Sequence, residues 1–452
     1  MGKEGTTDKK GEVTAFLSLI FVLLVSFILA MTKSAQVQTE KNVRRLEADR
    51  AVYSLFGEYQ KELLEEYDIF ALEGTYETGT FDEQQILDRL IYYGCSNVQQ
   101  EITGIQYLTD NDGQAFREQI LEYMETKSGL GMVEDMMGAS AEWESQKIQG
   151  EQASGQLEEV LEQGEALVPE HAEEIESLTK TGLLAIVLPE EFELSGKSIR
   201  KEQQVSERTK NIGKGHFPAR EDVYGIKGKV LFQQYLEEKL NSAVGKKTDG
   251  RSLDYELEYL ISGKNTDEEN LRDVVRQLLL VRMGLNYAYL MTDAQKKGEA
   301  DVMALTLATI AMVPEAKDAV KQLLLLLWAV GESTVDVRSL LGGKRIPAVK
   351  SSSNWVLPLS SVFTFWASKM EYEAGEQEKA LDYGAYLQIL LYMKNQKELT
   401  MRALDRVEEN LRFEKKKSFF FADYCITKIR LQNQTELWNG CTYSFPTYFG
   451  YL

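Results

Sequence analysis

Two carboxylates and an arginine have types and spacing suited to acid–base chemistry. Glu332 and Asp336 lie four residues apart in WAVGESTVDVRSLLGGKRIP, directly after five consecutive leucines. A helix places both on one face, and an apolar wall beside two carboxyl groups raises the pKa of one of them. Arg282, inside the apolar stretch LLLVRMGLNYAY, is a natural counter-ion. We predict an internal ion-pair network of Arg282, Glu332 and Asp336; the alternative is the acid–base pair of an exported hydrolase.

Other catalytic and metal-binding patterns are incomplete. His171 lies one helical turn from Glu174 but lacks a third ligand, and His216 lies in NIGKGHFPAR, which does not end as a phosphate-binding loop does. Ser198–Lys201 matches S-x-x-K and Lys180–Gly182 matches K-T-G, in the reverse of the order found in penicillin-recognising serine enzymes. We therefore predict no catalytic residue, no cofactor, no metal site and no enzymatic activity.

The three cysteines, Cys95, Cys425 and Cys441, are too few for a disulfide framework and have no C-x-x-C spacing. Cys425 and Cys441 lie sixteen residues apart in strand-like segments and are the candidates for a disulfide in an exported chain. Three unpaired cysteines are the other interpretation.

The chain is strongly acidic. It has 51 Lys and Arg residues against 71 Asp and Glu residues, a net charge of -20. A surface of this sign repels phosphates, so nucleic acid is excluded as a predicted partner.

Residues 13–31 form a long apolar run in which only Thr14, Ser18 and Ser26 are polar. As a helix these nineteen residues span about 28 Å, close to the hydrocarbon thickness of a bilayer. A cleaved signal has a shorter apolar run and a small-x-small cleavage site, so we predict a retained transmembrane helix. The predicted anchor residues are Val13, Phe16, Leu17, Leu19, Ile20, Phe21, Val22, Leu23, Leu24, Val25, Phe27, Ile28 and Leu29.

The charges that flank this run do not decide its orientation. Lysines precede it at positions 3, 9 and 10, and basic residues follow it at positions 33, 41, 44, 45 and 50. The total count favours a cytoplasmic location for the part after the run. The residues nearest the apolar ends, two lysines before and one after, favour a cytoplasmic N-terminus instead.

A stalk helix is predicted over residues 32–72. Its apolar face carries Ala48, Val52, Leu55, Tyr59 and Leu63 at helical spacing. That face must dock either on the protein's own globular part or on another subunit's helix, which would mean self-association through the stalk.

The remaining segments divide the chain further. Residues 1–12 form an N-terminal tail, 73–133 begin the globular part with a strand near 98–108, 134–180 are an acidic Glu/Gln-rich helical insert or linker, and 181–452 form the main domain.

Within the main domain, residues 255–261 alternate apolar side chains with Glu256 and Glu258, which predicts a half-buried strand with one wet face. Thr266 and Glu269 predict a helix start. The apolar stretches 302–313 and 320–330 are too short to cross a membrane and are predicted to be buried helices. Strands are expected in FFFADYCITKIRLQ and in the aromatic tail TYSFPTYFGYL, so the fold class is α+β, helix-dominated.

The opening KGEVTAFLSLIFVLLVSFILAMTKSAQVQ resembles the N-terminus of TadE-like pseudopilins of tight-adherence (Tad, Flp-type) pilus systems. Segments such as LLEEYDIFAL, GLLAIVLPEEFELSGKSI, YELEYLISGKNTDEENL and RALDRVEENLR resemble an uncharacterised family of anchored proteins of Gram-positive, clostridial-type bacteria, generally encoded with Tad pilus genes. This resemblance implies a cytoplasmic N-terminus and an extracellular bulk. It implies no catalytic residue.

The resemblance favours a non-catalytic, membrane-anchored, pseudopilin-like component or accessory factor of a Tad-type pilus or secretion system. Gly11 is a possible site of prepilin-type processing, although Phe16 replaces the glutamate usual at the fifth position after the cut. The alternative is a surface adhesin or ligand-binding protein using the aromatic tail. The sequence leaves open the identity of the partner, the oligomeric state and calcium binding.

Overall fold

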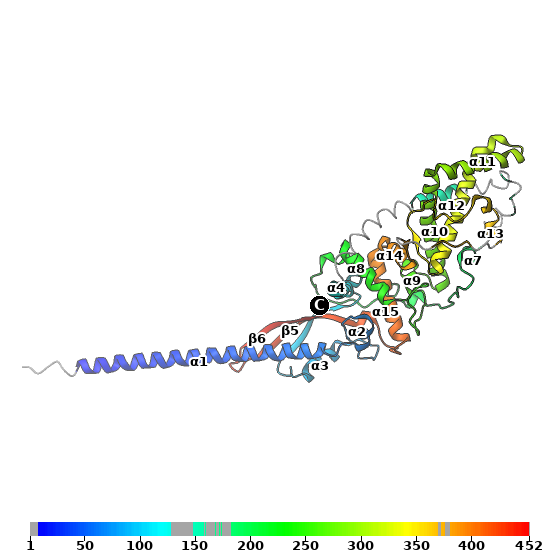
Figure 1. Ribbon diagram of the computed structural model, residues 1–452. Helices are drawn as coiled ribbons and strands as arrows, with labels where there is room; N and C mark the ends of the chain where they lie inside the picture. The colour runs from blue at the N-terminus through cyan, green and yellow to red at the C-terminus, as the bar shows by residue number, and fades with distance from the viewer. Residues whose placement is uncertain are drawn as a thin grey trace, which may run out of the picture.

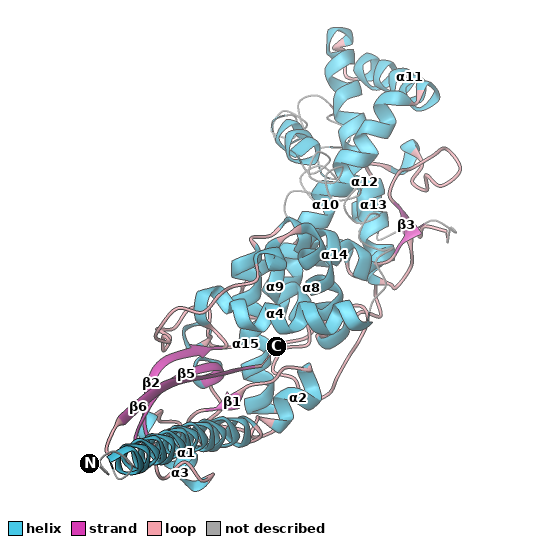
Figure 2. Cartoon of the chain, turned by 90° about the vertical axis from the view of Figure 1, so that its left-hand side faces the viewer, coloured by secondary structure: helices cyan, strands magenta, loops and turns pink. Residues whose placement is uncertain are grey.

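The computed structural model describes residues 8–127, 148–157, 182–368, 372–375 and 380–451, and the single residues 159, 168, 171 and 173. The molecule is elongated: the N-terminal half of α1 (Asp8–Phe56) projects alone from one end, and α11 (Ala294–Ile310) lies at the other (Figure 1). A small antiparallel sheet lies beside α1, and a helical body continues from it (Figure 2). As predicted, the fold is helix-dominated, with a long apolar N-terminal helix and a globular remainder.

Helix α1 is uninterrupted because it contains no proline and its single glycine, Gly11, lies near its start. Its last turns bury Ala48, Val52 and Leu55 in a core shared with the sheet. Of the two predicted partners for this apolar face, the structure therefore gives the protein's own globular part.

The predicted stalk helix over 32–72 is shorter in the structure. Helix α1 ends at Phe56, and a separate helix α2 (Lys61–Tyr67) begins after a four-residue break that starts at Gly57. Glycine disfavours helix, so the chain turns there. Leu63 is buried on α2, whereas Tyr59 lies in the break and is exposed.

Strand β5 (Cys425–Glu436) is the centre of the sheet. It pairs antiparallel with β2 (Gln99–Tyr107) and with β6 (Thr442–Gly450), and its first two residues pair with β1 (Leu72–Glu73). The strand expected near 98–108 and the two C-terminal strands are therefore present. The penultimate strand begins later than expected, at Cys425, because residues 422–424 form a turn of 3-10 helix.

A glycine-bearing loop covers the free edge of β2. The backbone of Lys214 pairs with that of Ile105 in an isolated antiparallel β-bridge. The amide of Gly213 donates to Asp110 Oδ1 at 3.1 Å. A Cβ atom on Gly213 would lie 2.1 Å from the carbonyl oxygen of Ile105, so only glycine allows this approach. The loop NIGKGHFPAR thus protects a sheet edge from pairing with another chain.

The helical body has two cores along its length. The core nearer the sheet is built mainly from α4 (Asp110–Lys127), α8 (Ile226–Lys239), α9 (Glu256–Ser262), α14 (Tyr383–Met393) and α15 (Gln396–Phe413). Helix α10 (Asp267–Thr292) runs through both cores: most of its buried residues lie in the core nearer the sheet, and Met283 and Leu290 lie in the distal core. The distal core is built mainly from α11 and α12 (Lys317–Leu341). Short elements complete the body: α7 (Leu183–Val187), α13 (Phe365–Ser368), and the pair β3 (Ile346–Pro347) and β4 (Ala380–Leu381). Helix α3 (Glu83–Tyr92) instead packs in the core that α1 shares with the sheet.

The predicted insert over 134–180 lies mostly outside the described residues. Its described part, residues 148–157, is helical and buries Ala153 and Leu157 in the distal core. One face of this helix is therefore packed on the body, and the other face, which includes Ile148, Glu151 and Gln152, is exposed.

The strand predicted over 255–261 is wrong. These residues form α9, and Glu256 and Glu258, expected on a wet face, are fully buried. A segment buried on all sides needs no helical amphipathic period, so the alternation of apolar and acidic residues was misleading. The neighbouring helix start is as predicted, since the Thr266 side chain accepts from the amide of Glu269.

The two apolar stretches differ in burial. Residues 320–330 lie in α12 and are largely buried, as predicted. The stretch 302–313 is half exposed: Ala304, Leu307 and Ala308 are buried, but the intervening apolar side chains face solvent. The structure places nothing over that side of α11 among the described residues.

The candidate disulfide between Cys425 and Cys441 is wrong, since both cysteines are free. Cys425 opens β5, and Cys441 lies in the turn beyond the other end of that strand. A twelve-residue strand separates its ends by about 35 Å, whereas a disulfide needs Cα atoms within about 7 Å.

We expect Gly213→Ala to destabilise the full-length protein by about 1–3 kcal/mol, because the added methyl group overlaps the backbone of β2. Gly196→Ala is the matched control, since its Cβ would meet nothing within 4 Å and should change stability by less than about 0.5 kcal/mol. Urea unfolding in detergent micelles measures both. Equal stability of the two variants would show that the loop does not need this contact.

Candidate functional site

A buried network of four charged side chains joins α10, α12 and the segment after β3. Arg282 Nη2 lies 2.7 Å from Asp336 Oδ2, and Lys350 Nζ lies 2.7 Å from Asp336 Oδ1 and 2.6 Å from Glu332 Oε1. All four side chains have no exposed area. Two cations and two carboxylates balance, which is the condition for burying charge at acceptable cost.

Hydrogen bonds complete the network. Arg282 Nη1 donates to the carbonyl oxygens of Pro347 and Ala348 at 3.0 and 2.9 Å, and Asn286 Nδ2 donates to Asp336 Oδ2 at 3.0 Å. Glu332 accepts from the amide of Leu357 at 2.8 Å and from that of Val356. The network therefore fastens two irregular segments, around 347–350 and 354–357, to the helices.

The electrostatics separate the two carboxylates. Burial raises the pKa of Asp336, but the charges of Arg282 and Lys350 more than offset it, and the pKa lies below its usual value. Burial and the nearby Asp336 charge raise the pKa of Glu332 despite its contact with Lys350.

The structure thus brings together all three residues that the sequence singled out, Arg282, Glu332 and Asp336. It adds Lys350, which sequence reasoning missed because a lysine beside Ser351–Ser353 reads as a surface residue. Neither carboxylate has exposed area, so a substrate has no access to them. The arrangement is that of a structural ion-pair network. The hydrolase alternative needs Glu332 and Asp336 to be open to a cleft, and they are buried.

A groove of about 580 Å³ lies next to this network and is lined by Trp328, Trp355 and Lys296. The Lys296 ammonium lies 4.6 Å from the centre of the Trp328 ring and 4.9 Å from that of Trp355. Both indole N–H groups donate to the Leu357 carbonyl oxygen. The indole N–H groups at the groove are thus already hydrogen-bonded within the protein.

Two further buried carboxylates lie at the start of α9. Glu256 accepts from the amide of Asn241, and Glu258 accepts from the amide of Ala243 and from the Tyr383 hydroxyl. Burial raises the pKa of Glu258 to about 7. These carboxylates thus satisfy backbone amides of the irregular segment after α8 and hold it against α9, which is a structural role.

The described residues of the other candidate patterns have structural partners, and Lys180 and Thr181 lie outside the part of the chain that the structure describes. His171 stacks on Phe363 with ring centres 4.1 Å apart, and its proposed co-ligand Glu174 lies outside the described residues. The backbone of Ser198 forms an isolated β-bridge with Thr266, and Lys201 forms a salt bridge with Glu207. Among the residues that the structure describes, no group of three His, Cys, Asp or Glu side chains is placed to hold a metal ion.

The anchor residues behave as one exposed apolar surface. Every predicted anchor side chain from Val13 to Leu29 is solvent-exposed, and α1 is long and apolar enough to span a membrane. Gly11 lies within α1, and a Cβ atom added to it would meet nothing within 4 Å. Such a surface needs a non-aqueous environment.

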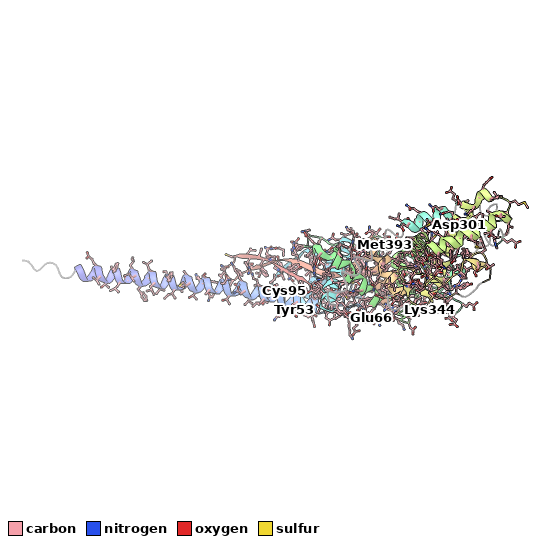
Figure 3. The ribbon with its side chains drawn as sticks, turned by 45° about the horizontal axis from the view of Figure 1, so that its top comes forward. Tyr53, Glu66, Cys95, Asp301, Lys344 and Met393 are labelled. Atoms are coloured by element: carbon pink, nitrogen blue, oxygen red, sulfur yellow. The ribbon has the colours of Figure 1, made fainter. Side chains whose placement is uncertain are left out.

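A second exposed apolar surface lies at the other end of the molecule, where Figure 3 labels Asp301. We call it the distal apolar cluster. Met312, 89% exposed, adopts a left-handed backbone conformation (φ 59°) that favours glycine. This conformation ends α11 as a helix C-cap, in which the amide of Met312 donates to the carbonyl oxygen of Thr309 and that of Val313 to the carbonyl oxygen of Ala308. The turn leaves the Met312 side chain pointing into solvent. The cluster comprises Val302, Leu305, Ile310, Met312 and Val313.

The aromatic tail is mostly an internal feature. Phe445 is buried, and Phe449 packs on Phe56 with ring centres 4.4 Å apart. Tyr451 stacks on Phe70. Only Tyr448 of the tail residues considered for an adhesin is largely exposed.

The sequence profile of a family of unknown function, DUF5702, matches residues 162–437. The chain belongs to this DUF5702 family. The matched region contains the buried charge network, Glu256 and Glu258, and the distal apolar cluster, whereas α1 and β6 lie outside it. Neither the curated proteins nor the solved structures that were searched contain a match to the chain.

We expect Arg282→Met to destabilise this DUF5702 protein by about 3–5 kcal/mol, because Asp336 loses its main counter-ion while remaining buried. Arg272→Met, on the same helix but in an exposed pair with Glu268, should cost less than about 1 kcal/mol. The double variant Arg282→Met, Asp336→Leu should recover part of the loss. Chemical unfolding measures all three, and a small effect of Arg282→Met would contradict a structural role.

Glu258 should make stability fall as pH rises. Its pKa is about 7 in the folded protein and near 4.5 when unfolded, so its favourable contribution is complete below pH 4.5 and is lost as pH rises through 7. Glu258→Gln should therefore be more stable than wild type at pH 8, by up to about 3 kcal/mol, and similar at pH 4.5. Glu202→Gln, at an exposed site, is the control. A stability difference independent of pH would refute this.

Proposed function

We propose that this DUF5702 protein is a non-catalytic, membrane-anchored, pseudopilin-like component or accessory factor of a Tad-type pilus assembly or secretion system. The observation that carries the proposal is the continuity of α1. One helix has an exposed apolar half and a second half packed into the sheet core. Such a helix can keep a folded body attached next to the outer face of a bilayer.

The anchor has one physical requirement and one topological one. The nineteen residues 13–31 match the hydrocarbon thickness, and lipid would cover the apolar side chains that water now faces. In the proposed topology the short tail before residue 13 is cytoplasmic, and the body is extracellular. An uncleaved anchor makes the protein a platform, whereas processing at Gly11 would permit extraction into a filament.

The distal apolar cluster supplies the proposed docking surface for pilus or secretion proteins. It lies at the end of the body farthest from the anchor, where a partner outside the membrane has access (Figure 1). Five exposed apolar side chains on and just after α11 favour a protein partner over a small charged ligand.

Substitution on the cluster tests the proposal. We expect the full-length double variant Val302→Asp, Leu305→Asp to stay in the membrane fraction but to lose at least about tenfold in co-purification with pilus subunits, because charge enters an apolar interface. Ile212→Asp, at an exposed apolar site outside the cluster, is the control and should bind as wild type does. Wild-type protein that captures no pilus subunit, or a variant that binds normally, would count against the proposal.

A further inference from the structure

The β5–β6 hairpin runs along α1 toward its apolar half (Figure 1). Phe449 packs on Phe56 near the end of α1, and further along the hairpin the Lys41 ammonium lies 4.9 Å from the centre of the Tyr443 ring. At the hairpin tip the amide of Trp438 donates to Glu40 Oε2 at 3.0 Å. The tip is therefore held beside residue 40 of the helix.

The charges of α1 show where residue 40 would lie relative to a bilayer. Lys33 is the only charged residue between Glu12 and Glu40. At 1.5 Å per residue these two glutamates lie about 42 Å apart, which matches the roughly 40–45 Å thickness of a bilayer including its headgroup regions. A lysine at position 33 can extend its ammonium into the headgroups. Glu40 thus falls at the outer limit of the interface.

The hairpin tip exposes a tryptophan, Trp438, which is a side chain suited to the membrane–water interface. Trp438 is 54% exposed although its neighbour Leu437 is buried, and residues 439–442 are exposed as well. Indole prefers the membrane–water interface because it combines an apolar ring with one N–H donor. Two carboxylates lie near the tip: Glu40, which accepts from the Trp438 amide, and the exposed Glu436 at the end of β5.

We propose that the tip of the β5–β6 hairpin, led by Trp438, contacts the headgroup region of the bilayer that holds α1. The inference rests on the proposed anchoring of α1 and adds a second contact with the same membrane. A single helix leaves the body free to tilt and rotate, whereas a second contact beside it fixes both.

The native thiols allow a direct test on the full-length protein. Cys441 at the tip is exposed, whereas Cys95 and Cys425 are buried and burial raises the pKa of both thiols, so a maleimide fluorophore labels Cys441 selectively. The labelled protein is reconstituted into phosphatidylcholine vesicles that contain lipid with a nitroxide on its headgroup. The reference probe is Met312→Cys in a Cys441→Ser background, at the distal end.

We expect headgroup nitroxide to quench the Cys441 probe at least about threefold more strongly than the Met312→Cys probe. Trp438→Ala should weaken that quenching, whereas Tyr448→Ala, which removes a side chain of the same 54% exposure higher on β6, should leave it unchanged.

The outcomes separate the two proposals. Protein that fails to enter the vesicles overturns the anchor and this inference together. Protein that is anchored but whose Cys441 probe is quenched no more than the distal probe overturns only the hairpin contact. Quenching that is strong but insensitive to Trp438→Ala overturns the role of the tryptophan.

Discussion

The packing of the last turns of α1 against the sheet is the contact on which the arrangement of the molecule depends. Ala48, Val52, Leu55 and Phe56 enter the same core as β5 and β6, while the same helix continues for tens of ångströms without any cover. Because a helix is stiff over this length, the body cannot move relative to the apolar half without breaking that core. This junction therefore sets how the sheet is placed relative to the apolar half of α1.

The body beyond the sheet is held by buried charge as well as by apolar packing. The network around Asp336 and the glutamates of α9 each bind backbone amides or carbonyls of segments that have no regular secondary structure. Those segments cannot satisfy their polar groups within a helix or strand, so side chains must do it. Charged groups are therefore used inside the protein to hold irregular backbone. This explains why Glu332 and Asp336 resemble an acid–base pair in the sequence but have no exposed area in the structure.

The two exposed apolar surfaces lie at opposite ends of the elongated shape (Figure 1). The apolar half of α1 is long and apolar enough to span a membrane, and the distal apolar cluster is the docking surface that we propose for a protein partner. Membership of DUF5702 covers the end with the cluster but not α1. The matched region and the long apolar helix are therefore separate parts of the chain.

Several features were determined by the sequence alone because their causes are local. The length of the apolar run, its continuation into a helix beyond residue 31, the cap at Thr266 and the C-terminal strands follow from composition and short-range spacing, whereas the end of that helix at Phe56 was not predicted. Arg282 was recognisable because a charge within an apolar helix needs a partner.

Tertiary structure decided the rest. The identity of Lys350 as the second cation, the helical state and burial of Glu256 and Glu258, and the exposure of the outer side of α11 depend on which segments pack against them from elsewhere in the chain. The same alternation of Glu with apolar residues suits a half-wet strand or a buried helix, and only the long-range contacts that solvate or satisfy the carboxylates choose between them.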